Sequence, residues 1–302
     1  MGHTPELDKA LSELKKVTGI VLDVYVDSPE EQEFALAQIH SLSLAYKEKY
    51  NKSHFLQSLM TEGIPAYDIL KRASNLHIDA EVPRVLFLAE TKNILDDTII
   101  QVLKNLFPSQ SKTYLVSMSE KSIAILRPLK VCETDEDMDH LSHTIVDTLN
   151  MEALTHVQIA YSGNMDTLSE LPGAFRETSL ALQVGKLFYS GQTVFPYNQL
   201  GVGRLIYRLP SGICESFLKE IFGNGAPEPF DAETTAAINK FFQNNLNIAE
   251  TSRQLHMHRN TLIYRLEQIE KKTGLDIRKF EDAMTLKIAI MVMNYLQTER
   301  NS

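Results

Sequence analysis

The chain has 302 residues, 43% of them hydrophobic, and a net charge of −9 from 30 basic and 39 acidic side chains. This length predicts two or three domains, and the apolar content excludes a disordered chain. Neither a run of about 18 apolar residues nor a basic-then-apolar amino terminus is present, so we expect a soluble, cytoplasmic protein with no membrane partner. Cys132 and Cys214 lie far apart and lack a motif partner, which predicts two free thiols.

Residues 1–76 predict helices around one strand. The apolar run at 19–26 is typical of a buried strand. Ser28 and Glu31 have capping-box spacing around Pro29, so a helix should begin there. Further helices are expected at residues 51–60 and 66–74. The long helices could form core or a dimer seam, and the role of this segment stays open.

Strand and helix patterns alternate through residues 82–200. Strands are expected at 82–90, 113–118, 121–129 and 156–162, and helices at 96–107, 138–149 and 171–189. A short Ser119-Glu120 turn predicts an antiparallel hairpin. This order indicates an α+β fold around a mixed sheet.

A stretch with several prolines and glycines, residues 196–229, predicts a domain boundary, and residues 223–230 read as a linker. Within it, Gly201-Val202-Gly203 lacks the third glycine of a dinucleotide-binding turn. After the linker, Asp231 should cap a helix. The last helix, 280–296, has more apolar positions than one neighbour needs, so it could cover a bundle or contact another subunit.

Between these two helices, residues 247–273 predict a helix-turn-helix. Asn247 and Glu250 have capping-box spacing, so a first helix should begin near Ile248. After a break at residues 256–257, a second helix carries one apolar stripe. That stripe consists of Leu262, Leu266 and Ile269.

The polar side of this second helix has the side-chain types that read DNA. At about 100° per residue, Asn260, Tyr264 and Lys271 point almost opposite the stripe. Asparagine pairs with adenine and arginine with guanine, whereas threonine, tyrosine and lysine contact phosphates. The candidate DNA-binding residues are His258, Arg259, Asn260, Thr261, Tyr264, Arg265, Gln268 and Lys271. An ordinary helix hairpin with a solvated polar face remains the alternative on pattern alone.

Charge and histidine spacing add two observations. Residues 231–302 hold 10 basic and 9 acidic side chains, against 20 and 30 in residues 1–230, so the acidic body differs from the tail. This asymmetry suits a regulatory body and a DNA-binding tail.

His256 and His258 lack a cysteine or carboxylate that would complete a metal site, which favours structural or phosphate-contact roles.

The segment 255–276 resembles the carboxyl-terminal signature of the PucR/CdaR (sugar diacid regulator) family of bacterial transcription regulators. The resemblance is carried by Leu255, His258, Arg259, Asn260, Thr261, Leu262, Tyr264, Arg265, Leu266, Ile269, Thr273, Gly274 and Asp276. It implies that the middle of the chain is a GGDEF-like domain, a relative of nucleotide cyclases. A working cyclase needs acidic metal ligands and a Gly-Gly-rich turn, which Ser119-Glu120 does not provide. The acidic run at residues 133–137 precedes a helix and is typical of a solvated first turn.

We therefore predict a degenerate GGDEF-like α/β domain at residues 77–222 and an all-α helix-turn-helix bundle at 231–302, after a segment at 1–76. The expected function is sequence-specific, effector-responsive transcriptional regulation on double-stranded operator DNA, by a homodimer or larger assembly. Neither catalytic residues nor a metal or cofactor are expected. The alternative is a small-molecule-binding or nucleotidyl enzyme whose helical tail mediates protein contacts. About sixty residues are too few for the sensory domain usual in the family, so the effector remains unknown.

Overall fold

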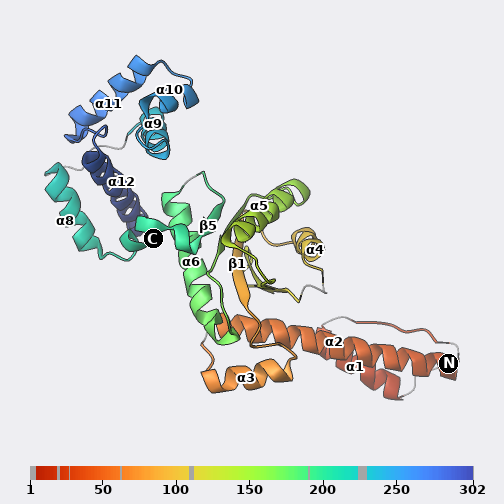
Figure 1. Ribbon diagram of the computed structural model, residues 1–302. Helices are drawn as coiled ribbons and strands as arrows, with labels where there is room; N and C mark the ends of the chain where they lie inside the picture. The colour runs from red at the N-terminus through yellow and green to blue at the C-terminus, as the bar shows by residue number, and fades with distance from the viewer. Residues whose placement is uncertain are drawn as a thin grey trace. The chain divides into compact units, whose positions relative to one another are not determined.

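A computed structural model describes residues 5–18, 21–26, 28–61, 63–108, 112–189, 191–223 and 230–301 (Figure 1). The chain divides into two compact units, residues 1–182 with 192–199, and residues 183–191 with 200–302. Most of the predicted linker, residues 223–230, lies outside the described residues. The division at 1–76, 77–222 and 231–302 stays a prediction.

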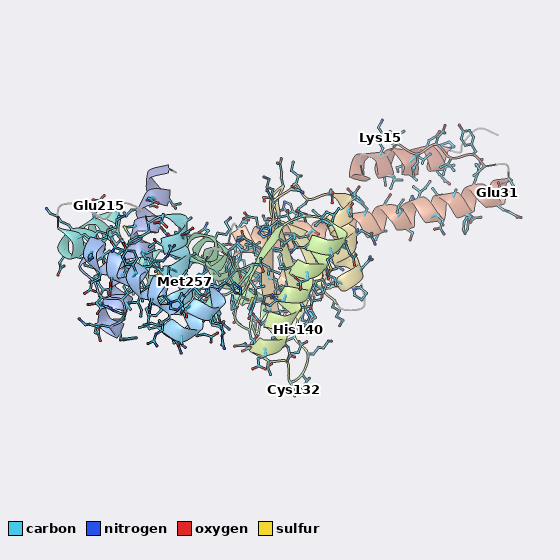
Figure 2. The ribbon with its side chains drawn as sticks, turned by 90° about the horizontal axis from the view of Figure 1, so that it is seen from above. Lys15, Glu31, Cys132, His140, Glu215 and Met257 are labelled. Atoms are coloured by element: carbon cyan, nitrogen blue, oxygen red, sulfur yellow. The ribbon has the colours of Figure 1, made fainter. Side chains whose placement is uncertain are left out.

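The first unit begins with two helices that pack side by side, α1 (Pro5–Thr18) and α2 (Pro29–Thr61). Figures 1 and 2 show α1 alongside the first half of α2. As predicted, Ser28 caps α2, and its hydroxyl accepts the Glu31 N–H at 3.2 Å. The prediction of two helices between residues 29 and 60 is wrong. Neither proline nor glycine interrupts residues 30–62, so the helix continues for 33 residues.

The predicted strand at 19–26 is also wrong for the residues that the structure describes. Residues 21–26 form no strand, and Tyr25 is 88% exposed. Val24 and Val26 instead pack against the small cluster between α1 and α2. An apolar run becomes a strand only where a sheet edge accepts its backbone groups, and this segment lies against helices instead.

A mixed sheet of five strands forms the centre of the first unit, in the order β2-β3-β1-β4-β5. The strands are β1 (Arg84–Thr91), β2 (Tyr114–Ser117), β3 (Ser122–Pro128), β4 (Val157–Tyr161) and β5 (Val194–Pro196). β1 pairs antiparallel with both β3 and β4, whereas β5 runs parallel to β4. The predicted hairpin of β2 and β3 is confirmed.

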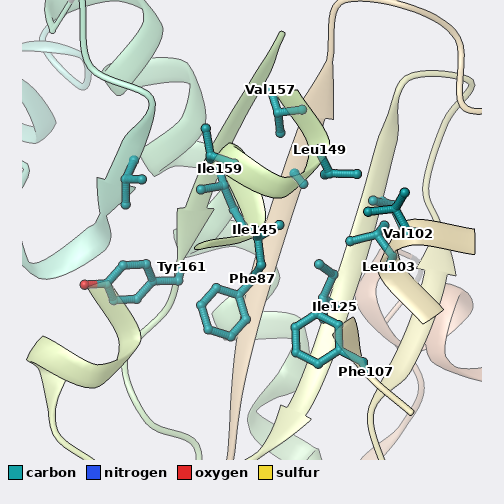
Figure 3. Packing of buried hydrophobic residues seen from close by; sticks show 14 of the residues in the cluster. Phe87, Val102, Leu103, Phe107, Ile125, Ile145, Leu149, Val157, Ile159 and Tyr161 are labelled. Carbon is teal, nitrogen blue, oxygen red and sulfur yellow. The ribbon is translucent and has the colours of Figure 1, made fainter. Parts of the chain in front are cut away.

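Helices cover this sheet, which explains why β1 is apolar at every position from Val85 to Ala89. One face packs against α4 (Asp97–Leu106) and α5 (Asp135–Glu152), and its side chains include Phe87, Ile125 and Tyr161 (Figure 3). Leu86 and Leu88, which point to the other face, are buried as well. The remaining elements before β5 are α3 (Ala66–Asn75), a 3-10 turn (Leu168–Glu170) and α6 (Leu171–Phe188).

The second unit holds the carboxyl-terminal helices. They are α7 (Gly201–Ile206), α8 (Ser211–Phe222), α9 (Ala232–Gln243), α10 (Ile248–Gln254), α11 (Arg259–Thr273) and α12 (Phe280–Asn301). The Gly-Val-Gly segment begins α7. A side chain at Gly203 would meet Val184 and Phe188 at 3.1 Å, so this glycine permits close helix packing. A structural reason therefore accounts for one of the two glycines in this segment.

Two hydrophobic clusters share α12. Its first half contributes Ala283 and Leu286 to the core of α9 and α11. From Ala289 onward it contributes Ala289, Val292 and Leu296 to a cluster with α7 and α8. The excess of apolar positions that the sequence showed thus serves two neighbours.

Candidate nucleic-acid interface

The helix-turn-helix is defined by caps at each end of its two helices. Asn247 caps α10 by accepting the Glu250 N–H at 3.1 Å, as predicted. The other half of the expected capping box is not formed, because the Glu250 carboxylate bonds to Arg253 and Gln254. Thr251 is fully buried, and its hydroxyl accepts a hydrogen bond from the Asn244 amide at 3.2 Å, which ties α10 to the end of α9.

His256 allows the sharp turn between α10 and α11. Its φ is 51°, in the left-handed region that follows the end of many helices. The His256 N–H donates to the Arg253 carbonyl and the Met257 N–H to the Ser252 carbonyl, which is the Schellman pattern. Figure 2 labels Met257 in this turn. His256 therefore has a backbone role, and in the described residues no three His, Cys, Asp or Glu side chains gather to hold a metal.

His258 is the N-cap of α11. Its Nδ1 accepts the Asn260 N–H at 3.2 Å, so a neutral ring carries its proton on Nε2. The predicted structural role is thus present, while the side chain is also exposed. A phosphate contact through Nε2 would use the atom that the cap leaves free.

The apolar stripe of α11 is buried as predicted. Leu262, Leu266 and Ile269 are each at most 1% exposed, and they pack with Ile238 and Phe241 of α9. This packing fixes which side of α11 faces outward.

The outward side of α11 brings together most of the predicted DNA-binding residues. Asn260, Thr261, Tyr264, Gln268 and Lys271 are all exposed. Tyr264 is 60% exposed, so it does not serve the core. Together they form a polar strip along about three turns of helix.

Arg259 and Arg265 lie outside this strip. Arg259 lies seven residues, or about two turns, before Leu266 and so is on the side of α11 that carries the apolar stripe. It is nevertheless exposed, because it is the first residue of α11. Arg265 forms an ion pair with Glu233 of α9, and its side chain is 25% exposed. No local sequence pattern predicts Glu233 as the partner, because 32 residues separate it from Arg265.

Two carboxylates stabilise the ends of the bundle. Asp231 caps α9, and backbone and side-chain hydrogen bonds from Thr234 lower its pKa. Asp276 follows α11, and a hydrogen bond from Arg278 holds the pKa of Asp276 below its ordinary value. Arg278 also bonds Glu270 at 2.8 Å, so it connects the end of α11 to the next loop.

Known proteins share both parts of this chain. Residues 235–292 match the PucR C-terminal helix-turn-helix domain, and residues 61–184 match a GGDEF-like domain. The chain belongs to the PucR/CdaR family of transcription regulators. In this PucR/CdaR-family chain the matched helix-turn-helix includes α10 and α11 entirely.

Named relatives of this family member are regulators. The Purine catabolism regulatory protein of Bacillus subtilis (strain 168) is 29% identical over 141 residues, which are 46% of this chain and 27% of that protein. The Carbohydrate diacid regulator of Escherichia coli (strain K12) is 23% identical over 273 residues, 86% of this chain and 70% of that protein. The crystal structure of Regulator of Polyketide Synthase Expression from Bifidobacterium adolescentis aligns over 83% of this chain and 99% of that one, with a TM-score of 0.39 and 14% identity.

The middle domain has an α+β fold, as predicted. Its β2–β3 turn is closed by Ser119, whose hydroxyl lies 2.7 Å from that of Ser122, with Glu120 between them. The acidic run at 133–137 is divided between two roles. Glu133 pairs with Arg127, and Asp137 completes a capping box with Thr134 at the start of α5.

No helix in the described part of the chain is long and apolar enough to cross a membrane.

Proposed function

We propose that this protein regulates transcription by binding operator DNA through the exposed strip of α11. One observation carries the proposal. The buried stripe of Leu262, Leu266 and Ile269 leaves a continuous polar strip of adenine-reading and phosphate-contacting side chains on the other side of a PucR-type helix. A helix-turn-helix reads the major groove with the beginning of its second helix, where Asn260 and Thr261 lie.

The residues have separate roles in this proposal. Asn260 reads a base edge, and Arg259 reaches the groove from the first position of α11. Thr261, Tyr264 and Lys271 contact phosphates, with Gln268 beside them and His258 at the amino-terminal end. Arg265 joins the contact when it leaves Glu233.

The middle domain serves regulation and not catalysis in this proposal. Its β2–β3 turn, Ser119-Glu120, offers no Gly-Gly-rich acidic loop for a nucleotide and Mg²⁺. Two of the relatives named above are a purine catabolism regulatory protein and a carbohydrate diacid regulator, and on this likeness we propose a small-molecule effector for this chain. A cytoplasmic location, where the chromosome is accessible, follows from the same proposal.

Two copies act together on DNA. One recognition helix contacts only a few base pairs, and specific sites combine two half-sites about 34 Å apart. We therefore propose a homodimer or a larger assembly.

Selection of bound fragments from genomic DNA tests the function. Purified protein is expected to enrich a small set of sites with two related halves, and Asn260→Ala is expected to reduce this enrichment about 5- to 150-fold. Asn294→Ala is the matched control, because Asn294 is an exposed asparagine of α12 beside Val292, which packs with α7 and α8. Equal enrichment of all fragments by the unmodified protein would contradict sequence-specific regulation.

A further inference from the structure

Helix α2 has apolar residues on two opposite sides. One side packs against α1, where Ile39 is 5% exposed and contacts a cluster that contains Leu7, Ala10 and Leu14. This side is therefore already covered within the chain.

The other side is exposed to solvent. We call Phe34, Ala37, Ser41 and Leu44 the outer stripe. At about 100° per residue these four side chains lie within roughly 80° of one another and nearly opposite Ile39. Phe34 and Leu44 are each 68% exposed, which is unusual for two large apolar side chains on one stripe.

The spacing of the outer stripe suits a helix partner. Its members follow one another at intervals of three, four and three residues, the intervals of a coiled-coil seam. Large residues stand at both ends and small ones in the middle. The stripe therefore presents the same order of sizes in either direction, as a self-complementary contact requires.

The alternative seam on α12 is occupied. Leu286 lies in the helix-turn-helix core, and Ala289 and Val292 pack with α7 and α8. All three are at most 2% exposed. Of the two seams that the sequence offered, the one on α2 is thus the one whose apolar side chains are exposed.

We propose that the outer stripe of α2 is the contact between two copies of this chain. The inference rests on the proposed function, because a two-half operator requires two recognition helices held in one assembly. Two α2 helices would bury their Phe34 and Leu44 side chains against each other. Because each copy contributes only two large apolar side chains, we expect the contact to bury less than a standard interface of about 1,600 Å² and the dimer to dissociate on dilution.

Sedimentation velocity without DNA tests the contact. Across protein concentrations from about 1 to 200 μM, the unmodified chain is expected to shift from monomer to dimer. Leu44→Ala should raise the dissociation constant by about tenfold or more, because about 1.4 kcal/mol of lost contact has that effect. Phe34→Ala should act in the same direction.

Leu42→Ala is the matched control. Leu42 is the same residue type on the same helix and is 52% exposed, but it points about 160° away from Leu44. It should dimerise like the unmodified chain, and circular dichroism should show equal helix content in all variants. A monomer at every concentration, or equal weakening by Leu42→Ala and Leu44→Ala, would overturn the proposal.

DNA binding is measured separately so that the two proposals fail separately. Asn260→Ala should weaken operator binding by roughly 5- to 150-fold and keep the dimer. An unmodified chain that binds its operator but remains monomeric in solution and on DNA would remove the α2 contact and leave the recognition helix intact. A dimer that α2 substitutions weaken, but that selects no DNA, would support the contact and contradict the proposed function.

Discussion

Arg265 on α11 is held by Glu233 on α9, so a residue of the proposed DNA-binding set is engaged inside the free protein. The Glu233 side chain is 77% exposed. An ion pair that is exposed to water contributes only about 0.2–1 kcal/mol to stability. The pair is thus weak enough to exchange for a phosphate when DNA arrives.

Glu233→Gln is expected to strengthen DNA binding by releasing Arg265. If Arg265 then contacts a phosphate in place of Glu233, the slope of the logarithm of the binding constant against the logarithm of the salt concentration should become steeper by about one unit. Titration of operator DNA at several salt concentrations measures both quantities. Glu281→Gln removes the same charge from the first turn of α12 and leaves the Arg265 pair intact, so it separates release of Arg265 from simple loss of a negative charge. Identical results for the two variants would show that Arg265 makes no contact with DNA.

Arg259→Ala and Asn260→Ala should each cost roughly 1–3 kcal/mol of operator binding, because each removes a proposed base contact. Both side chains are exposed, so thermal melts should stay close to that of the unmodified protein. Competition between operator and scrambled DNA measures the effect. Unchanged operator affinity in both variants would mean that α11 is not the reading helix.

Leu266→Ala is the stability control for these variants. Leu266 is 1% exposed in the core of α9, α11 and α12, and loss of a buried leucine costs about 2–5 kcal/mol of unfolding free energy. Urea unfolding should show this loss. A change near zero would contradict the packing of the bundle.

Lys271→Ala should weaken operator and scrambled DNA equally. A lysine that contacts only phosphate carries no sequence information. Its loss should lower the slope of the logarithm of the binding constant against the logarithm of the salt concentration by roughly one unit. The measurement is a salt titration with both DNAs. Preferential loss of operator binding would place Lys271 at a base edge instead.

Glu133 should make the middle domain sensitive to acid. Hydrogen bonds from Arg127, and then from the Lys130 backbone, lower its pKa, and its side chain is only 15% exposed. A carboxyl whose folded pKa is depressed stabilises the fold above its unfolded pKa of about 4.3 and loses that contribution as pH falls through the folded pKa.

Glu133→Gln should therefore be less stable than the unmodified protein at neutral pH, and the difference should narrow as pH falls below about 4. Urea unfolding at a series of pH values measures this. Glu152→Gln, at an exposed carboxylate on the last turn of α5, should show no such convergence. A constant difference for Glu133→Gln would mean that its charge does not act through Arg127.

Purified protein incubated with GTP and Mg²⁺ should form no cyclic dinucleotide. The Ser119-Glu120 turn lacks the Gly-rich acidic loop that this chemistry needs. Chromatography of the reaction detects the product. Turnover above a protein-free blank would restore the enzyme alternative.

Local sequence determined much of the secondary structure. Asn247 and Asp231 begin their helices where expected, because each cap is a hydrogen bond between residues three positions apart. The continuous apolar runs of β1 and β3 and the stripe of Leu262 and Leu266 likewise indicate which side chains become buried. The helix-turn-helix could be predicted because its signals are local.

Tertiary structure decided the rest. The apolar run at 19–26 had strand character, but the described residues 21–26 lie against helices, and only the assembled chain shows that. The partner of Arg265 is 32 residues away, and the second neighbour of α12 is the α7 and α8 pair, earlier in the chain. Such contacts depend on how helices pack in space, and helical periodicity reports only which side is apolar, not what covers it.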